Sequence, residues 1–230
     1  MLKPIKSKSR SRTLKKFYKT MKKHEIREIF EILSIQNPNA KIELTHENAF
    51  TLLIAVVLSA QATDKQVNKI TPAIFAEVKT PKDLLEKGEK WLFEKVKSIN
   101  YNNSKAKNLM KTSLQLQENF GGIVPNTREE LETLAGVGRK SANVILNSIF
   151  KQSTMPVDTH IFRISNRIGL VKAKNVLETE EKLLKIVPKE FGLSAHHLLI
   201  LHGRYVCKAI KPDCKNCKIQ DLCKFEKKSS

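Results

Sequence analysis

Residues 131–143, LETLAGVGRKSAN, join two helix-forming segments through a Gly-x-Gly turn. A helix-forming stretch over residues 127–134 precedes the turn. After it, apolar residues recur at helical spacing on one face of a second helix: Ala142, Ile145, Leu146, Ile149 and Phe150. The pattern predicts a helix-hairpin-helix over residues 127–150.

The chemistry of this turn suits a phosphate group. Glycine permits positive φ angles and a close approach of the backbone to a ligand. The second helix presents unpaired N–H groups and the positive end of its dipole, which attract an anion. A Gly-x-Gly also occurs where two helices simply turn. With the basic residues that follow, we predict that Gly136, Val137, Gly138 and Arg139 contact DNA.

Lys140 follows at the start of the second helix. At about 100° per residue it lies nearly opposite the apolar stripe centred on Ile149 and projects away from the packing face. An ordinary solvated lysine is the simplest interpretation. In a cleft, however, an amine near the positive end of a helix and shielded from water loses its charge more readily and can attack carbon.

The rest of the chain predicts an all-α fold. Only eight glycines and eight prolines occur in 230 residues, which favours long helices. The apolar run 50–58, opened by residues 45–47, predicts a helix buried on all sides. Two further helices have one apolar face each, formed by Ile26, Ile29, Phe30 and Leu33 and by Val176, Leu183, Leu184 and Val187. No apolar stretch reaches the length of a membrane span, so we expect no membrane partner.

The net charge of +19 is concentrated at the two ends. Residues 1–24 carry ten Lys or Arg and no acid, and residues 203–230 carry eight against three. Such an excess favours nucleic acid as a partner, although a solvated lysine-rich surface gives the same count. We predict a basic disordered tail over 1–20 and a second tail over 226–230. Because lysine outnumbers arginine in the first tail, organelle targeting is less favoured than a cytoplasmic, nucleoid-associated location.

All four cysteines fall near the C-terminus, at Cys207, Cys214, Cys217 and Cys223. The spacing C-x6-C-x2-C-x5-C, with no other cysteine in the chain, argues against a disulfide framework and predicts a metal centre. A four-cysteine zinc site and a 4Fe-4S cluster both fit this inventory, although zinc ribbons usually contain two C-x2-C pairs. Interleaved lysines, including Lys208 and Lys211, place positive charge around the loop.

Five segments together resemble the endonuclease III family of the helix-hairpin-helix DNA glycosylase superfamily. They are LSAQATD (58–64), NSKAKN (103–108), LAGVGRKSAN (134–143), VDTHIFRISNR (157–167) and HGRYVC (202–207) with its cysteine loop. The resemblance covers residues 22–225. It implies two helical lobes that flank a DNA-binding cleft: a six-helix barrel over 42–152, and a discontinuous lobe of 21–41 and 153–225 that carries a 4Fe-4S cluster on the four cysteines.

The resemblance also implies an activity. The family removes oxidised or saturated pyrimidines from duplex DNA after turning the damaged nucleotide out of the stack. Lys140 would attack C1′, displace the base and form a Schiff base that supports β-elimination 3′ to the abasic site. Asp158 would face Lys140 across the cleft and assist, although an aspartate at this position is also a good helix N-cap. We expect a monomer that acts on damaged or abasic duplex DNA.

Residues around the extruded nucleotide depart from the family pattern in part. Gln61 matches the residue that fills the gap left by the base. Tyr101 stands where a leucine-like wedge is expected, and Asn100 replaces the usual glycine, so we expect strand opening to survive with altered base preference. Ala135 stands at a position that is often proline, which predicts a slightly looser turn. We also predict that Lys208 and Lys211 contact phosphates.

Two other interpretations share some of these features. Adenine-mismatch glycosylases have the same fold and cluster, but they lack a lysine nucleophile and carry a further C-terminal domain, so Lys140 and an end at Ser230 disfavour them. A non-catalytic helix-hairpin-helix module with a structural metal would keep the glycines and cysteines without needing Lys140 or Asp158.

Overall fold

A computed structural model describes residues 21–226 of the chain. Every regular element in this range is helical, which confirms the predicted all-α class. The predicted tail over 1–20 and residues 227–230 lie outside the described residues. The helices are α1 (Lys23–Gln36), α2 (Ala49–Ser59), α3 (Asp64–Phe75), α4 (Pro81–Val96), α5 (Asn102–Phe120), α6 (Arg128–Thr133), α7 (Arg139–Ser148), α8 (Thr159–Ile168), α9 (Val176–Ile186) and α10 (Ala195–Leu201), with a 3₁₀ turn at Lys189–Phe191 and a π-helical turn at His202–Val206.

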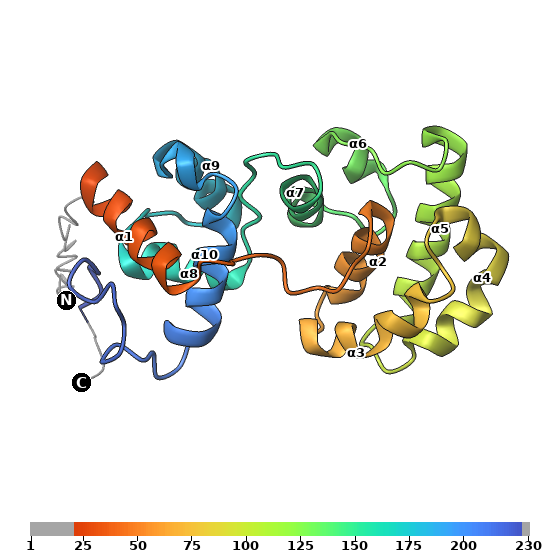
Figure 1. Ribbon diagram of the computed structural model, residues 1–230, viewed down its shortest axis with the longest axis horizontal. Coiled ribbons are helices and arrows are strands. Elements are labelled where there is room, and N and C mark those ends of the chain that lie inside the picture. Colours follow the sequence, from red (N-terminus) through yellow and green to blue (C-terminus); the bar gives the residue numbers. More distant parts are fainter. Residues whose placement is uncertain (1–20, 227–230) are drawn as a thin grey trace, which may run out of the picture.

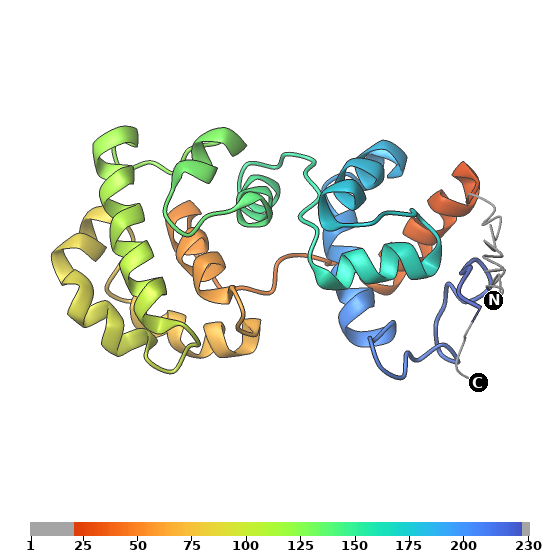
Figure 2. The same cartoon turned by 180° about the vertical axis from the view of Figure 1, so that it is seen from behind.

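The helices form two groups, each with its own buried core (Figures 1 and 2). The first lobe comprises α2 to α7, whose buried apolar cluster runs from Leu44 to Leu146. The second lobe comprises α1, α8, α9, α10 and the chain after α10, and its cluster joins residues 21–33 to residues 155–219. Two extended segments, 37–48 and 149–158, connect the lobes. No helix among residues 21–226 is both long and apolar enough to cross a lipid bilayer.

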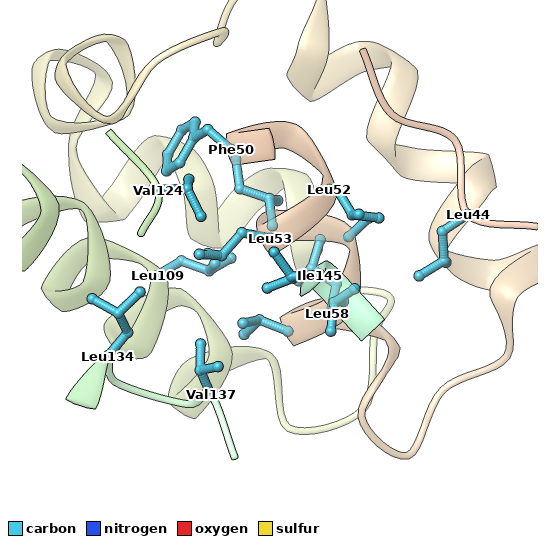
Figure 3. Packing of buried hydrophobic residues seen from close by; sticks show 14 of the residues in the cluster. Leu44, Phe50, Leu52, Leu53, Leu58, Leu109, Val124, Leu134, Val137 and Ile145 are labelled. Atoms are coloured by element: carbon cyan, nitrogen blue, oxygen red, sulfur yellow. The ribbon is translucent and has the colours of Figure 1, made fainter. Parts of the chain in front are cut away.

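Helix α2 is the centre of the first lobe. All residues from Phe50 to Leu58 are buried, as the all-round apolar run predicts. Figure 3 shows side chains from α2, α5 and α7 packed around Leu53. The helix begins at Ala49, after the expected opening, because Asn48 is its N-cap and accepts a hydrogen bond from the N–H of Thr51 at 2.9 Å. The predicted opening over residues 45–47 is therefore wrong.

Helix α9 buries a narrower stripe than its sequence predicts. Leu183 is fully buried, but Val176 and Leu184 are 46% and 47% exposed. The inner face is instead formed by Thr179, Glu180 and Leu183. The expectation of one continuous apolar face is wrong here because α9 lies at the edge of the second lobe, and its inner face includes a buried acid.

Helix α10 carries a buried histidine that makes stability depend on pH. Burial, with a smaller contribution from the charge of Lys151, lowers the pKa of His197 from 6.5 to about 4. Between these values the unfolded chain binds a proton that the folded chain does not, so this contribution to stability is complete above pH 6.5 and is lost as the pH falls toward 4. The lowering of the His197 pKa from 6.5 to about 4 corresponds to about 3 kcal/mol of stability.

We therefore expect the free energy of unfolding of the wild type to fall by about 3 kcal/mol more than that of His197→Gln between pH 7 and pH 4. Urea unfolding followed by circular dichroism measures both curves. Because all other titrating groups are shared, they cancel in the difference. Parallel curves for the two proteins would contradict a neutral, buried His197.

Candidate active site

The predicted hairpin is formed by α6, the turn 134–138 and α7. Gly136 has φ of +79°, and a Cβ there would come 3.0 Å from the side-chain nitrogen of Asn108, so only glycine fits. Gly138 is the N-cap of α7 and makes no side-chain cap hydrogen bond. The Val137 side chain is buried in the core, and its N–H donates to the Leu134 carbonyl at 3.1 Å. Val137 thus anchors the turn from within, and the start of α7 presents its N–H groups.

Helix α5 supports this turn from behind. The Thr112 hydroxyl donates to the carbonyl of Ala135 at 2.7 Å. Gln115 donates to the Thr133 carbonyl at 3.0 Å and accepts from the N–H of Ala135 at 2.9 Å. A proline at residue 135 would have no N–H for this last bond. Ala135 thus keeps an N–H donor that holds the turn against α5, and the slight loosening expected from the missing proline stays a prediction.

Lys140 is the second residue of α7 and lies at the junction of the two lobes. Its side chain is exposed and lines a cavity together with Ser59 and Asp64 of the first lobe and His196 and Arg204 of the second. The positive charge of Lys140 contributes, after burial and the neighbouring His197, to a pKa of His196 well below its usual value. Lys140 therefore lies at the wall of a cavity between the two lobes, and its role as a nucleophile stays a prediction.

A second and larger cavity adjoins the one at Lys140. It has a volume of about 820 Å³ and shares Glu43, Asp64 and Arg204 with its neighbour. His160 and Tyr205 also line it. Together we call the two cavities the depression: Lys140 lines the smaller one, and the larger one has a polar wall of carboxylates, a guanidinium and a phenol.

Arg204 connects the two lobes across this depression. From the π-helical turn it donates to Asp64 at 2.6 Å, in the first turn of α3, and to Glu43 at 2.5 Å, in the connecting segment. Burial alone would lower the pKa of Arg204, but these two carboxylates raise it. The Tyr205 hydroxyl donates to Glu43 at 3.0 Å, and this bond raises the pKa of the phenol.

Asp158 is the N-cap of α8. Its Oδ1 accepts a hydrogen bond from the N–H of Ile161 at 2.9 Å. No ion pair or hydrogen bond joins Asp158 to Lys140 within residues 21–226. The capping geometry uses one carboxylate oxygen, and the structure shows no further hydrogen bond to this side chain in the described range. Its catalytic role stays a prediction.

Gln61 and Tyr101 lie on adjacent loops of the first lobe. Both have left-handed backbone conformations, with φ of 54° and 59°, which non-glycine residues seldom adopt. The side chain of Asn100 donates to the carbonyl of Gln61 at 3.3 Å and so connects the two loops. Beneath them the buried amine of Lys105 donates to the carbonyl of Leu58 at 2.8 Å, near the end of α2. The structure therefore brings together two residues that the sequence separates by forty positions.

Arg139 does not project freely from the hairpin. Its guanidinium donates two hydrogen bonds to Glu180 of α9, from Nε at 2.9 Å and from Nη2 at 2.8 Å. These bonds raise the pKa of Arg139. The predicted contact between Arg139 and DNA stays a prediction, but the side chain already has a strong partner in the second lobe.

The four cysteines line one small cavity between α8 and the C-terminal loop. Arg167 of α8 lies 3.7 Å from the Cys207 sulfur through Nη1 and donates to the carbonyls of Lys208 and Ala209 at 2.7 and 3.2 Å. Within residues 21–226, no three His, Cys, Asp or Glu side chains converge as they would around a single ion. Lys208 and Lys211 are exposed on this loop, which lies at the end of the second lobe far from α7 (Figure 1).

Several residues of the depression were absent from the predicted site. The sequence predicts no role for Glu43, Asp64, Arg204, Tyr205 or His160. Asp64, Arg204 and Tyr205 lie inside the segments 58–64 and 202–207 that carry the family resemblance, so a signal for them was present. Nothing in the sequence indicated Glu43.

Comparisons with known proteins agree with this geometry. Residues 54–189 match the model of the HhH-GPD superfamily base excision DNA repair proteins. Endonuclease III of Haemophilus influenzae is 52% identical over 87% of this chain and 95% of its own length, and that of Escherichia coli K12 is 50% identical over 90% and 99%. A solved structure of a trapped endonuclease III–DNA covalent intermediate superposes with a TM-score of 0.84, at 42% identity, over 89% of this chain and 97% of that one. The chain therefore belongs to the HhH-GPD superfamily of base excision DNA repair proteins and, within it, to the endonuclease III family.

Proposed function

We propose that this protein is a DNA N-glycosylase and abasic-site lyase that removes oxidised or saturated pyrimidines from duplex DNA. Membership in the endonuclease III family supports both activities. One observation carries the proposal: the amine of Lys140 lines a cavity at the start of the hairpin helix, directly beside a larger polar cavity. A nucleophile, an anion-binding turn and space for an extruded nucleotide thus occur together.

In the proposed reaction, the free amine of Lys140 attacks C1′ of the extruded deoxyribose. The N-glycosylic bond breaks, and the base leaves with the bonding electron pair and takes up a proton. The sugar ring opens to an iminium, the Schiff base between Lys140 and C1′. Loss of a proton from C2′ then expels the 3′ phosphate by β-elimination, and water releases the lysine from the product.

The larger cavity would receive the extruded base. Glu43 and Asp64 offer acceptor oxygens, while Arg204 and Tyr205 hold those carboxylates in place. Saturation of the C5–C6 bond makes the ring non-planar, as in thymine glycol and dihydrouracil, and hydroxylated lesions such as thymine glycol also carry additional O–H donors. A polar wall of this kind recognises such lesions better than an apolar slot would. An unmodified base also costs more to unstack, which adds selectivity.

Asp158 supports the chemistry by charge. Its carboxylate lies at the start of α8 with one oxygen capping the helix. We propose that the same carboxylate stabilises the positive charge that develops on the sugar and assists proton movement around Lys140.

We propose that three parts of the protein contact the duplex. The turn 136–138 and the start of α7 would bind a phosphate through backbone N–H groups. Gln61 and Tyr101 would enter the duplex at the gap left by the extruded base. Lys208 and Lys211, remote from α7, would contact phosphates farther along the DNA and contribute mainly to salt-dependent affinity.

The cysteine loop fits a 4Fe-4S cluster. The four thiols that line one cavity would supply the ligands. Nη1 of Arg167 donates to the sulfur of Cys207, and such a positively charged donor stabilises a thiolate. When bound, the cluster would cross-link the loop to the second lobe. We propose that its role is structural, since base excision requires no net electron transfer.

The proposal is tested by incision of a panel of 5′-labelled duplexes. The panel contains thymine glycol, dihydrouracil, an abasic site, adenine opposite 8-oxoguanine, and an undamaged control. We expect cleavage of the first three and none of the last two. Cleavage of the adenine mismatch alone would instead indicate an adenine glycosylase, and binding without cleavage would indicate a non-catalytic module.

Tyr101 gives a prediction about strand opening. Replacing Tyr101 by alanine removes a ring that would stack between bases, an interaction of about 1–3 kcal/mol, so we expect base excision from duplex DNA to fall about fivefold or more. Tyr101→Phe keeps the ring and should stay near the wild-type rate. Single-turnover assays with thymine glycol measure both. Lyase activity on single-stranded abasic DNA should be equal in all three proteins, because no partner strand must be opened. Equal duplex rates for the alanine and phenylalanine variants would contradict the wedge.

A further inference from the structure

Glu180 is an unusual carboxylate in this protein. It lies on the inner face of α9, and its side chain is only 5% exposed. Among the described residues it is the only acidic side chain that is buried. A buried carboxylate is costly unless it is paired and hydrogen-bonded, so its partners determine what it does.

Both partners of Glu180 belong to the helix-hairpin-helix. Arg139 donates two hydrogen bonds to it, at 2.9 and 2.8 Å, and Nη1 of Arg128 lies 3.8 Å from the same carboxylate. Arg128 is the first residue of α6 and Arg139 is the first residue of α7. One carboxylate of the second lobe thus holds the starting points of both hairpin helices, which belong to the first lobe.

This contact acts on the turn of α7 that carries Lys140. Lys140 follows Arg139 directly, and Gly138 before it provides no side-chain cap. The buried contacts of α7 with the first-lobe core begin at Ala142, after the lysine. A bidentate arginine–carboxylate pair has a defined planar geometry, so it restrains the rotation and tilt of the first turn in a way that one flexible lysine bond could not.

From these contacts we infer that Glu180 is a positioning residue for Lys140. It acts through Arg139 and orients the first turn of α7 relative to the second lobe, which carries Asp158 and Arg204. The inference rests on the proposed role of Lys140 as nucleophile. The inference also places the side chain of Arg139 at the junction between the lobes. The hairpin would then bind phosphate through its backbone N–H groups, and the guanidinium of Arg139 would help to orient the amine of Lys140.

The test compares Glu180→Gln with Glu181→Gln. Both variants remove one negative charge from adjacent positions of α9, but Glu181 is exposed. Two quantities are measured: the single-turnover lyase rate on abasic duplex DNA, and the Kd for a duplex that contains a non-cleavable abasic analogue. Arg139 and Arg128 are 40% and 33% exposed, so water can solvate them once Glu180 is neutral, and we expect the variant to fold.

For Glu180→Gln we expect a rate about tenfold lower, because small displacements of a nucleophile have large effects on its reaction. Its Kd should be unchanged or tighter, since the released Arg139 adds a free positive charge near the DNA. Glu181→Gln should match the wild type in rate. Equal rates for the two variants would overturn the inference. So would a loss of rate accompanied by an equal loss of affinity, which indicates a general structural defect.

A double-mutant cycle identifies the route. If Glu180 acts through Arg139, adding Arg139→Gln to Glu180→Gln should cause no further loss of rate. Losses that multiply would show that Glu180 acts by another path and would overturn the inference. The outcome is distinct from failure of the proposed function, because in that case the wild type itself would form no covalent adduct with abasic DNA.

Discussion

Lys140→Ala is expected to form no covalent adduct with abasic DNA when the reaction is quenched with borohydride. The wild type should be trapped efficiently, because borohydride reduces the iminium between an amine and C1′ to a stable secondary amine. Lyase and glycosylase rates should both fall on the order of 10³-fold or more, since removal of a nucleophile leaves only binding and electrostatic contributions to catalysis. Gel electrophoresis of the cross-linked complex and single-turnover kinetics measure these effects.

Lys140→Arg is the matched control. Arginine keeps the positive charge at the start of α7 but stays protonated and forms no Schiff base. We expect affinity for abasic duplex DNA near that of the wild type, with no trapping. This variant separates the attraction of the lysine for phosphate from its action as a nucleophile. Trapping of Lys140→Ala at the wild-type level would assign the nucleophile to another amine, and the buried Lys105 would be the next to test.

The importance of Lys140 could be predicted from sequence only in part. Helical periodicity correctly places its side chain away from the packing face of α7. Its proposed reactivity depends on the cavity, however, and the cavity walls include Ser59, Asp64, His196 and Arg204. These residues are distant in the sequence and belong to both lobes. Periodicity within one helix carries no information about which distant segment faces it.

Arg139 shows a second limit of sequence reasoning. A basic residue beside a Gly-x-Gly turn favours a phosphate contact, and the local pattern gives no other partner. The structure pairs it with Glu180, 41 residues later, on a helix face where periodicity predicts apolar residues. A buried acid on an otherwise apolar face was the available signal, because such an acid needs a basic partner.

The fold itself was more predictable than the site. The run Phe50–Leu58 is apolar on all sides and therefore had to be buried, and the structure places it in the middle of the first lobe. Helix α9 was less predictable, since an edge helix leaves apolar residues such as Leu184 exposed. Packing position, which periodicity does not encode, separates these two cases.

The second large effect concerns the cysteine loop. Cys214→Ser is expected to lose the brown colour of an iron–sulfur cluster and to destabilise the second lobe by several kcal/mol, because binding of a structural metal centre contributes directly to folding. The contacts of the loop after α10 with the rest of the second lobe include those of Arg167 with Cys207, Lys208 and Ala209 and the ion pair of Lys224 with Glu25 of α1, and a bound cluster would add to them. Visible absorbance after anaerobic reconstitution and thermal unfolding measure the two effects.

Lys215→Ser provides the control, since it introduces serine at the adjacent, exposed position and leaves all four thiols in place. It should keep its colour and its unfolding temperature. A general effect of loop polarity would act alike at both positions. A difference between the two serine variants would therefore be due to the lost thiol. If the wild type binds zinc and shows no visible absorbance even after reconstitution with iron and sulfide, the four thiols form a zinc site. If Cys214→Ser is as stable and as coloured as Lys215→Ser, Cys214 is not a required ligand, and the predicted set of four cysteine ligands is wrong.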